Sequence, residues 1–243
     1  MKKSLLTIAS ASLMMLGVHA APVTASPGDV FLAFEDTVQN KNYLVDLGPG
    51  SNLSSFTSLN IGSDLATVFG GSWSSDSNLY YGVYGINSGK TQAWGSVLSG
   101  NNALPYKASG ALGAALSGYS ALANNFNAEL PTQGLSQGVY FAVGSGLDTG
   151  TATWTGNHPT ASGTSAFGTY NASLEAAVSL NQTLDVYKLA PSPVAAIFSA
   201  LNNNALGINS SGLVSVVPEP STYALVGLGG LVVVLAYRRK VRA

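Results

Sequence analysis

Two apolar segments next to positive charges, one at each end of this 243-residue chain, constrain its fold more than any other feature. Lys2 and Lys3 precede an apolar run over residues 5–18, and residues 223–237 are almost wholly apolar before a basic terminus. Neither segment is typical of a globular core, because each joins an uninterrupted apolar run to a cluster of cations. We therefore expect one folded body between these two ends.

The first segment is typical of a secretory signal peptide, in which a basic start is followed by a short apolar region and small residues. Small residues suited to signal peptidase cleavage are Ala20 and Ala25, each with a β-branched residue two positions before it. We predict a signal peptide over residues 1–25, with cleavage after one of these two alanines. Export would then use the Sec machinery.

The last segment predicts a transmembrane helix over residues 222–237. Sixteen residues at 1.5 Å each give about 24 Å, which is slightly short of a hydrocarbon core of about 30 Å. The tail over residues 238–243 should stay in the cytoplasm, because positive charge is retained on that side of the inner membrane. Its cations are Arg238, Arg239, Lys240 and Arg242.

Immediately before this helix, the sequence Val217-Pro218-Glu219-Pro220 completes a recognisable order of motif, apolar helix and basic tail. Two prolines prevent a helix or a central strand, so the motif should be extended and exposed. The order resembles the PEP-CTERM sorting signal of exported proteins in Gram-negative bacteria. This resemblance implies an exosortase as partner, cleavage near the motif, loss of the transient membrane anchor, and delivery to the cell surface or the exopolysaccharide matrix of a biofilm.

The predicted ectodomain, residues 26–216, has a composition that excludes several classes of function. The chain has no cysteine, which excludes disulfides, thiolate nucleophiles and cysteine-ligated metals. Four lysines against ten carboxylates leave this body with a net charge of -6 and no arginine, so nucleic acid is not a predicted partner. We expect no cofactor and no metal-binding motif.

Short apolar and aromatic runs separated by turn residues predict a mainly β ectodomain with some α-helix, a single sandwich-like unit. The first two runs should form a hairpin, and Ser210-Ser211-Gly212 should turn the chain into the last strand. The expected strands cover residues 30–34, 43–47, 79–86, 93–98, 138–143, 184–189 and 213–217.

Two or three helices are also expected. Ser63 is predicted to cap a short helix that Gly70 ends, and a 3.5-residue repeat predicts a helix over residues 112–126. Ser192 and Pro193 resemble a cap and a first-turn proline, so a third helix is expected over residues 192–201.

The most specific sequence signal for an enzyme is Ser136 in a Gly-x-Ser-x-Gly sequence, followed by Asp148 and His158 in hydrolase order. A nucleophile elbow needs a strand before the serine and a helix after it. Here Pro131 precedes the serine and an expected strand follows it, so the context is reversed. A glycosidase would need two paired carboxylates, for which Glu35, Glu129 and Glu175 and the seven aspartates of the body are available.

Aromatic side chains offer a different function, because flat rings can stack on sugars. The candidate stacking residues are Trp73, Trp94 and Trp154. Calcium needs only oxygen ligands, which Asp46 or residues 76–78 could contribute, although no calcium-binding loop motif is present.

The sequence therefore favours a non-enzymatic, exported surface or matrix protein without a catalytic residue. The alternatives are a carbohydrate-binding module and, from the serine motif, a secreted hydrolase.

Overall fold

The computed structural model describes residues 24–26, 28–39, 41–86, 92–101, 124, 126–131, 133–142, 159–160, 163–164, 176–190 and 196–218. Residues 1–23 of the predicted signal peptide, the predicted transmembrane helix and the basic tail lie outside these described residues. The description therefore concerns the ectodomain.

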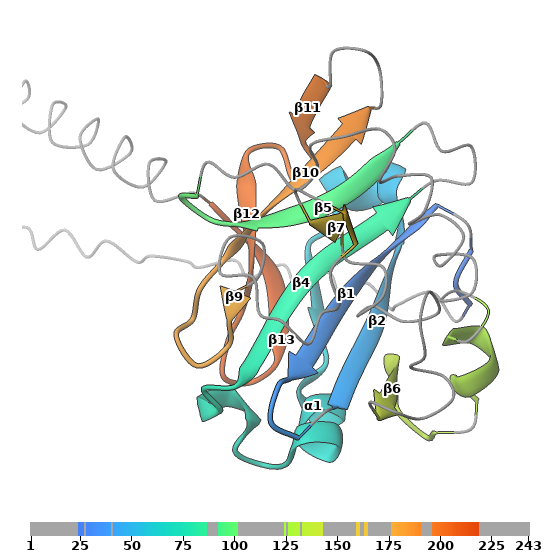
Figure 1. Cartoon of the computed structure of the whole chain (residues 1–243), viewed down its shortest axis with the longest axis vertical. Coiled ribbons are helices and arrows are strands. Elements are labelled where there is room, and N and C mark those ends of the chain that lie inside the picture. The colour runs from blue at the N-terminus through green and yellow to red at the C-terminus, as the bar shows by residue number, and fades with distance from the viewer. Residues whose placement is uncertain are drawn as a thin grey trace, which may run out of the picture.

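The described part of the ectodomain is built around one curled antiparallel sheet, in the order β3-β13-β12-β10-β5-β4-β1-β2-β6 (Figure 1). In addition, β9 pairs with β4 and β11 pairs with β10, while β7 and β8 form a separate small hairpin. The strands are β1 Asp29–Asp36, β2 Lys41–Pro49, β3 Ser58–Asn60, β4 Leu79–Ile86, β5 Ala93–Leu98, β6 Gly138–Ala142, β7 Pro159–Thr160, β8 Gly163–Thr164, β9 Ala176–Ala177, β10 Leu184–Ala190, β11 Ala196–Ser199, β12 Asn204–Ile208 and β13 Leu213–Pro218.

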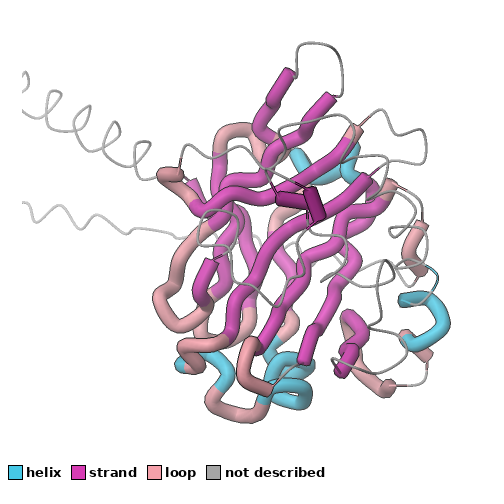
Figure 2. Tube along the Cα trace, in the orientation of Figure 1, coloured by secondary structure: helices cyan, strands magenta, loops and turns pink. Residues whose placement is uncertain are grey.

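This architecture confirms the prediction of a mainly β fold but corrects its sandwich-like form. A sandwich has two sheets packed face to face, whereas here one twisted sheet curls until its own ends approach across the core. The labelled short helices are α1 Gly62–Phe69, η1 Gly50–Ser55 and η2 Trp73–Ser75. Residues 126–129 are also helical, and these helical segments lie at the periphery of the strands (Figure 2).

The predicted opening hairpin is formed by β1 and β2, in a register that pairs Phe34 with Tyr43. The turn between the strands is held by Asp36, whose Oδ1 accepts hydrogen bonds from the backbone N–H groups of Val38 and Gln39 at 2.8 and 2.7 Å. An aspartate that bonds the backbone two residues later stabilises a turn in this way. The other five predicted strands are also present, as β4, β5, β6, β10 and β13.

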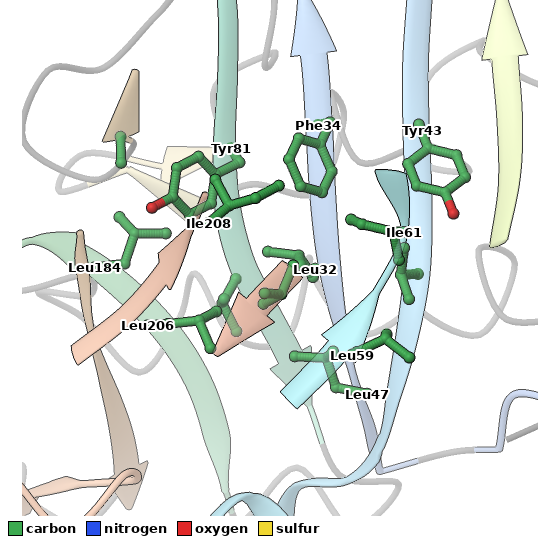
Figure 3. Close-up of a cluster of buried hydrophobic side chains, with 14 of the residues drawn as sticks. Leu32, Phe34, Tyr43, Leu47, Leu59, Ile61, Tyr81, Leu184, Leu206 and Ile208 are labelled. Atoms are coloured by element: carbon green, nitrogen blue, oxygen red, sulfur yellow. The ribbon is translucent and has the colours of Figure 1, made fainter. Parts of the chain in front are cut away.

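The hydrophobic core lies inside the curl of the sheet (Figure 3). Alternate residues of the central strands meet residues of β12, β13 and the β3–α1 connection, which lie across the core from them. The rings of Phe34 and Tyr81 stack with centroids 5.7 Å apart. The labelled core residues are Leu32, Phe34, Tyr43, Leu47, Leu59, Ile61, Tyr81, Leu184, Leu206 and Ile208.

The opposite face of the central strands is also buried, which explains why β1 is an almost continuous apolar run. Phe31, Ala33 and Tyr84 on this face are fully buried, and the ring of Phe31 lies 5.3 Å from that of Phe126. Strands buried on both faces lose the simple alternation of polar and apolar residues. Any carboxylate on this face is therefore removed from water.

The first predicted helix is present as α1, but Ser63 is not its cap. Ile61 occupies the N-cap position, and the Oδ1 atom of Asn60 accepts the N–H of Gly62 at 3.1 Å. The helix begins earlier because the N–H of Ile61 donates to the carbonyl of Gly212 at 2.9 Å, which brings the chain close to the last turn. Gly70 ends the helix with a positive φ of 94°, as the sequence predicts.

The predicted helix over residues 192–201 is wrong for its described part. Residues Ala196–Ser199 form strand β11 and pair with β10. Asn202 and Asn203 then turn the chain with φ values of 55° and 60°. A segment this short is a marginal helix, and its β-branched and aromatic residues pair with an available strand instead. Residues 192–195 and most of the predicted helix over residues 112–126 lie outside the described residues.

Leu32 tests the importance of the core, because its side chain is fully buried on the central strand. We expect Leu32→Ala to lower the free energy of unfolding by about 2–5 kcal/mol, since the substitution leaves a cavity. Val38→Ala is the matched control, because Val38 is 66% exposed. Urea unfolding followed by tryptophan fluorescence measures both, and an equal effect of the two substitutions would contradict this account of the core.

Candidate functional site

The predicted sorting motif begins inside the sheet. Strand β13 extends through Pro218, which is two residues beyond the predicted end of the ectodomain, and pairs with β12 along its length. Val217 lies opposite Ala205, and Pro218 lies opposite Asn204. Both motif residues are extended, as predicted, but they are half-buried rather than exposed. Glu219 and Pro220 lie outside the described residues.

The start of β13 is held more tightly than its end. Asn209 Oδ1 accepts hydrogen bonds from the N–H groups of Ser211 and Leu213, both at 3.0 Å, and Gly212 takes a positive φ of 82° in this turn. On its second side, β13 pairs with β3 only from Leu213 to Ser215. The strand is therefore paired on both sides at first and on the β12 side alone at Val217 and Pro218.

Uncharged polar residues surround the point at which β13 ends. Asn202 Nδ2 donates to the carbonyl of Ser54 at 3.2 Å, which ties the β11–β12 turn to η1. Asn204 Nδ2 donates to the carbonyl of Leu201 at 3.0 Å within the same turn. Both of these hydrogen bonds join a side-chain amide to a backbone carbonyl.

A second polar group is the buried carboxyl pair of Asp29 and Asp46, on the outer face of β1 and β2. The two residues are only 4% and 0% exposed. Asp29 Oδ2 accepts the N–H of Ser26 at 2.5 Å, and Asp46 Oδ1 accepts the N–H of Gly48 at 2.7 Å. Each carboxyl group influences the pKa of the other, so the two groups lie near each other in this enclosed place.

Burial determines the charge of this pair. Desolvation raises the pKa of Asp46 to about 8, and the nearby Asp29 carboxylate raises it further. Burial also raises the pKa of Asp29, against the lowering effect of its hydrogen bonds to Ser26 and Asp46. With a pKa of about 8, the Asp46 carboxyl keeps its proton at neutral pH.

The proposed calcium ligands do not come together in this part of the chain. Asp46 faces Asp29, whereas Asp76 Oδ1 accepts the N–H of Asn78 at 2.8 Å in a turn before β4. Across the described ranges, no group of three or more histidine, cysteine, aspartate and glutamate side chains could hold a metal ion.

Ser136 is held in place by a buried aspartate that sequence reasoning missed. Asp64 of α1 accepts hydrogen bonds from the hydroxyl and the N–H of Ser136, at 2.9 and 3.0 Å, and from the N–H of Gln137 at 2.8 Å. The hydroxyl of Tyr43 donates to the same carboxylate at 2.7 Å. Burial and the charge of Asp64 both raise the pKa of Tyr43. Asp64 thus fastens the segment before β6 to α1 and β2.

These contacts agree with the reversed context of the hydrolase motif. Gly138 starts strand β6 directly after Ser136, and the preceding residues form no described strand. The serine hydroxyl donates to a carboxylate that already accepts three other hydrogen bonds. Asp148 and His158 lie outside the described residues.

The candidate glycosidase carboxylates are on separate elements. Glu35 is buried on β1 opposite Asn42, and Glu129 Oε2 accepts a hydrogen bond from Gln133 at 3.2 Å. Glu175 lies outside the described residues.

Two of the three candidate stacking tryptophans fill the interior instead. Trp73 is 5% exposed and Trp94 is 3% exposed. A Cβ atom on Gly50 would lie 2.3 Å from Cε2 of Trp94, so the ring packs directly on the backbone of η1. The prediction that these two rings present exposed faces to a sugar is therefore wrong, and Trp154 lies outside the described residues.

Comparison with known proteins identifies the end of the chain. Residues 216–240 match the PEP-CTERM protein-sorting motif. The chain therefore carries the C-terminal signal of an exported, surface-targeted protein. The signal is that of exosortase substrates, with an exosortase as the processing partner. No curated protein matches the chain, and no solved structure does so. Within the described residues, no helix is long and apolar enough to cross a membrane.

Asp64→Asn tests the hydrogen-bond network around Ser136. The amide nitrogen of asparagine cannot accept the bonds that the carboxylate accepts, so buried donors lose their partner. We expect the free energy of unfolding to fall by about 1–3 kcal/mol. Asp76→Asn is the matched control, because its carboxylate accepts one N–H in a turn. Equal urea midpoints for the two variants would contradict the role given to Asp64.

Asp46→Asn tests whether the Asp46 carboxyl keeps a proton in the folded chain. The pKa of Asp46 is about 8 in the folded chain and about 3.8 when unfolded, so the folded state holds a proton that the unfolded state releases between these values. Stability should therefore fall as pH rises from about 4 to about 8 and then level off. Asp46→Asn should flatten this dependence, because asparagine does not ionise.

Urea unfolding at several pH values from 4 to 9 measures the effect. Asp185→Asn is the control, because it alters a half-buried carboxylate that accepts a hydrogen bond from Ser99 at 2.6 Å. If the free energy of unfolding of Asp46→Asn and of Asp185→Asn depends on pH as in the unchanged chain, Asp46 does not keep a proton in the folded state.

Proposed function

We propose that this protein is a non-enzymatic component of the cell surface or exopolysaccharide matrix, delivered there by exosortase processing. The observation that carries the proposal is the match of residues 216–240 to the PEP-CTERM sorting motif. The order of motif, apolar segment and basic tail supports it from the sequence.

In this proposal, the Sec machinery exports the chain and the signal peptide over residues 1–25 is removed. The apolar segment over residues 222–237 then holds the chain in the inner membrane, with the tail on the cytoplasmic side. Exosortase cuts near Pro218-Glu219-Pro220, so the anchor is lost and the β-rich body reaches the surface or matrix. The ectodomain acts there as a structural or adhesive component.

The arrangement of the described side chains supports a non-enzymatic role. Ser136 donates its hydroxyl to Asp64, and the carboxyl pair of Asp29 and Asp46 is enclosed. A nucleophile or acid–base pair must instead reach a substrate in a cleft. A carbohydrate-binding module would have to use rings other than the buried Trp73 and Trp94.

Replacing Pro218-Glu219-Pro220 with three alanines tests the sorting route. We expect the variant to stay at full length in the membrane fraction, because its processing signal is lost, whereas the unchanged chain appears as a shorter product in the medium or matrix. Intact mass spectrometry of both fractions from the native host measures this.

The matched control is Glu129→Ala combined with Pro131→Ala, which removes a glutamate and a proline outside the motif. This control should be processed like the unchanged chain. The sorting proposal fails when the triple alanine variant yields a truncated surface product as abundantly as the control does.

A further inference from the structure

We propose that the curled sheet sets the N-terminal limit of exosortase processing: no bond before Pro218 is cut, and the mature chain keeps β13 complete. This inference rests on the proposed sorting function and specifies where processing occurs. The earliest bond available to the protease is then the one between Pro218 and Glu219.

The first argument is that β13 enters the sorting motif. The sorting match begins at residue 216, and the strand continues to Pro218. Val216, Val217 and Pro218 lie opposite Leu206, Ala205 and Asn204 of β12. Proteases commonly bind a substrate as a separate extended strand, whereas β13 is paired with β12 along one edge as far as Pro218, so cutting inside β13 requires this pairing to open. The paired residues are therefore poor substrate while the fold is intact.

The second argument is side-chain packing at the same place. Val217 is half-buried, and a Cβ atom placed on Gly207 would lie only 3.2 Å from Cγ2 of Val217. The absence of a side chain at Gly207 therefore gives Val217 its space against β12. Val214, earlier on the strand, is fully buried in the main core. Withdrawal of Val217 would consequently begin to open the strand that closes this core.

The third argument concerns what a cut inside β13 would leave. β12 pairs with β10 only at Leu206 and Ala205, so β13 is its partner over a longer stretch. Loss of Val217 and Pro218 would expose the backbone of Asn204 and Ala205 at a sheet edge. Unpaired edges promote association with other chains, which a protein released at the surface must avoid.

The fourth argument is the short connection to the predicted membrane segment. Four residues, 219–222, separate Pro218 from Tyr223, where the apolar run begins. Four extended residues span at most about 14 Å. The end of the sheet must therefore lie close to the membrane-embedded protease, and the uncharged Asn202–Asn204 turn beside it can approach the lipid surface without repulsion.

The chemistry is the breaking of one peptide C–N bond after Pro218 or a later residue. The carbonyl carbon of that residue gains an oxygen from water, or an oxygen or nitrogen from a surface acceptor. The departing nitrogen takes the proton that the water or acceptor loses. The folded body, complete to Pro218, keeps the acyl group at its new C-terminus.

The test is the C-terminus of the mature protein from the native host, determined by intact mass and by sequencing of the terminal peptide. We expect a chain that ends at Pro218 or a later residue before 223. A mature chain that ends at Val217 or earlier overturns the inference while sorting stands. A chain that ends only at Ala243 rejects the sorting function, and this inference with it.

Hydrogen exchange gives a second, independent measurement. The amides of Ala205 and Leu206 should be equally protected in the mature product and in the triple alanine variant, which keeps β13 unchanged as far as Val217. A drop in protection of tenfold or more in the mature product, with unchanged protection in β1, would show that β13 has been shortened or withdrawn and would overturn the inference.

Discussion

The packing of β1, β2 and β4 against β12 and β13 inside one curled sheet is the interaction on which the rest of the structure depends. Leu32, Phe34 and Tyr81 on the central strands meet Ile208 and Val214 across the core. Because β1 is buried on both faces, its polar residues have no contact with bulk water. The raised pKa of Asp46, about 8, is a direct result of this enclosure, since burial disfavours the ionised carboxylate.

The same sheet connects stability with sorting. Strand β13 closes the core through Val214 and then continues into the first residues of the sorting motif. Its early part has partners on both sides, whereas its last residues pair with β12 alone. The backbone of β13 is therefore held on both edges at the start of the strand and on one edge at Val217 and Pro218.

The sequence predicted most strands because their apolar and β-branched runs are short and bounded by turn residues. The predictions failed where the structure depends on residues far away in the sequence. Residues 196–199 pair with β10 and do not form a helix. Ile61, and not Ser63, is the N-cap of α1, because its N–H donates to the carbonyl of Gly212. Solvent exposure was harder to predict than secondary structure. Trp73 and Trp94 resemble sugar-binding residues in the sequence, but both are buried in the folded chain. Asp64 gave one usable signal, a carboxylate among the apolar residues of a short helix.

The contrast between the two parts of the chain has a physical cause. A sorting signal is read as a linear segment, so its order of prolines, apolar residues and cations is recognisable without the fold. The body instead depends on pairings between residues far apart, such as Asp64 with Ser136 and Asp29 with Asp46. Ser136, Trp73 and Trp94, which resembled catalytic or binding residues in the sequence, are used in those pairings or in the core.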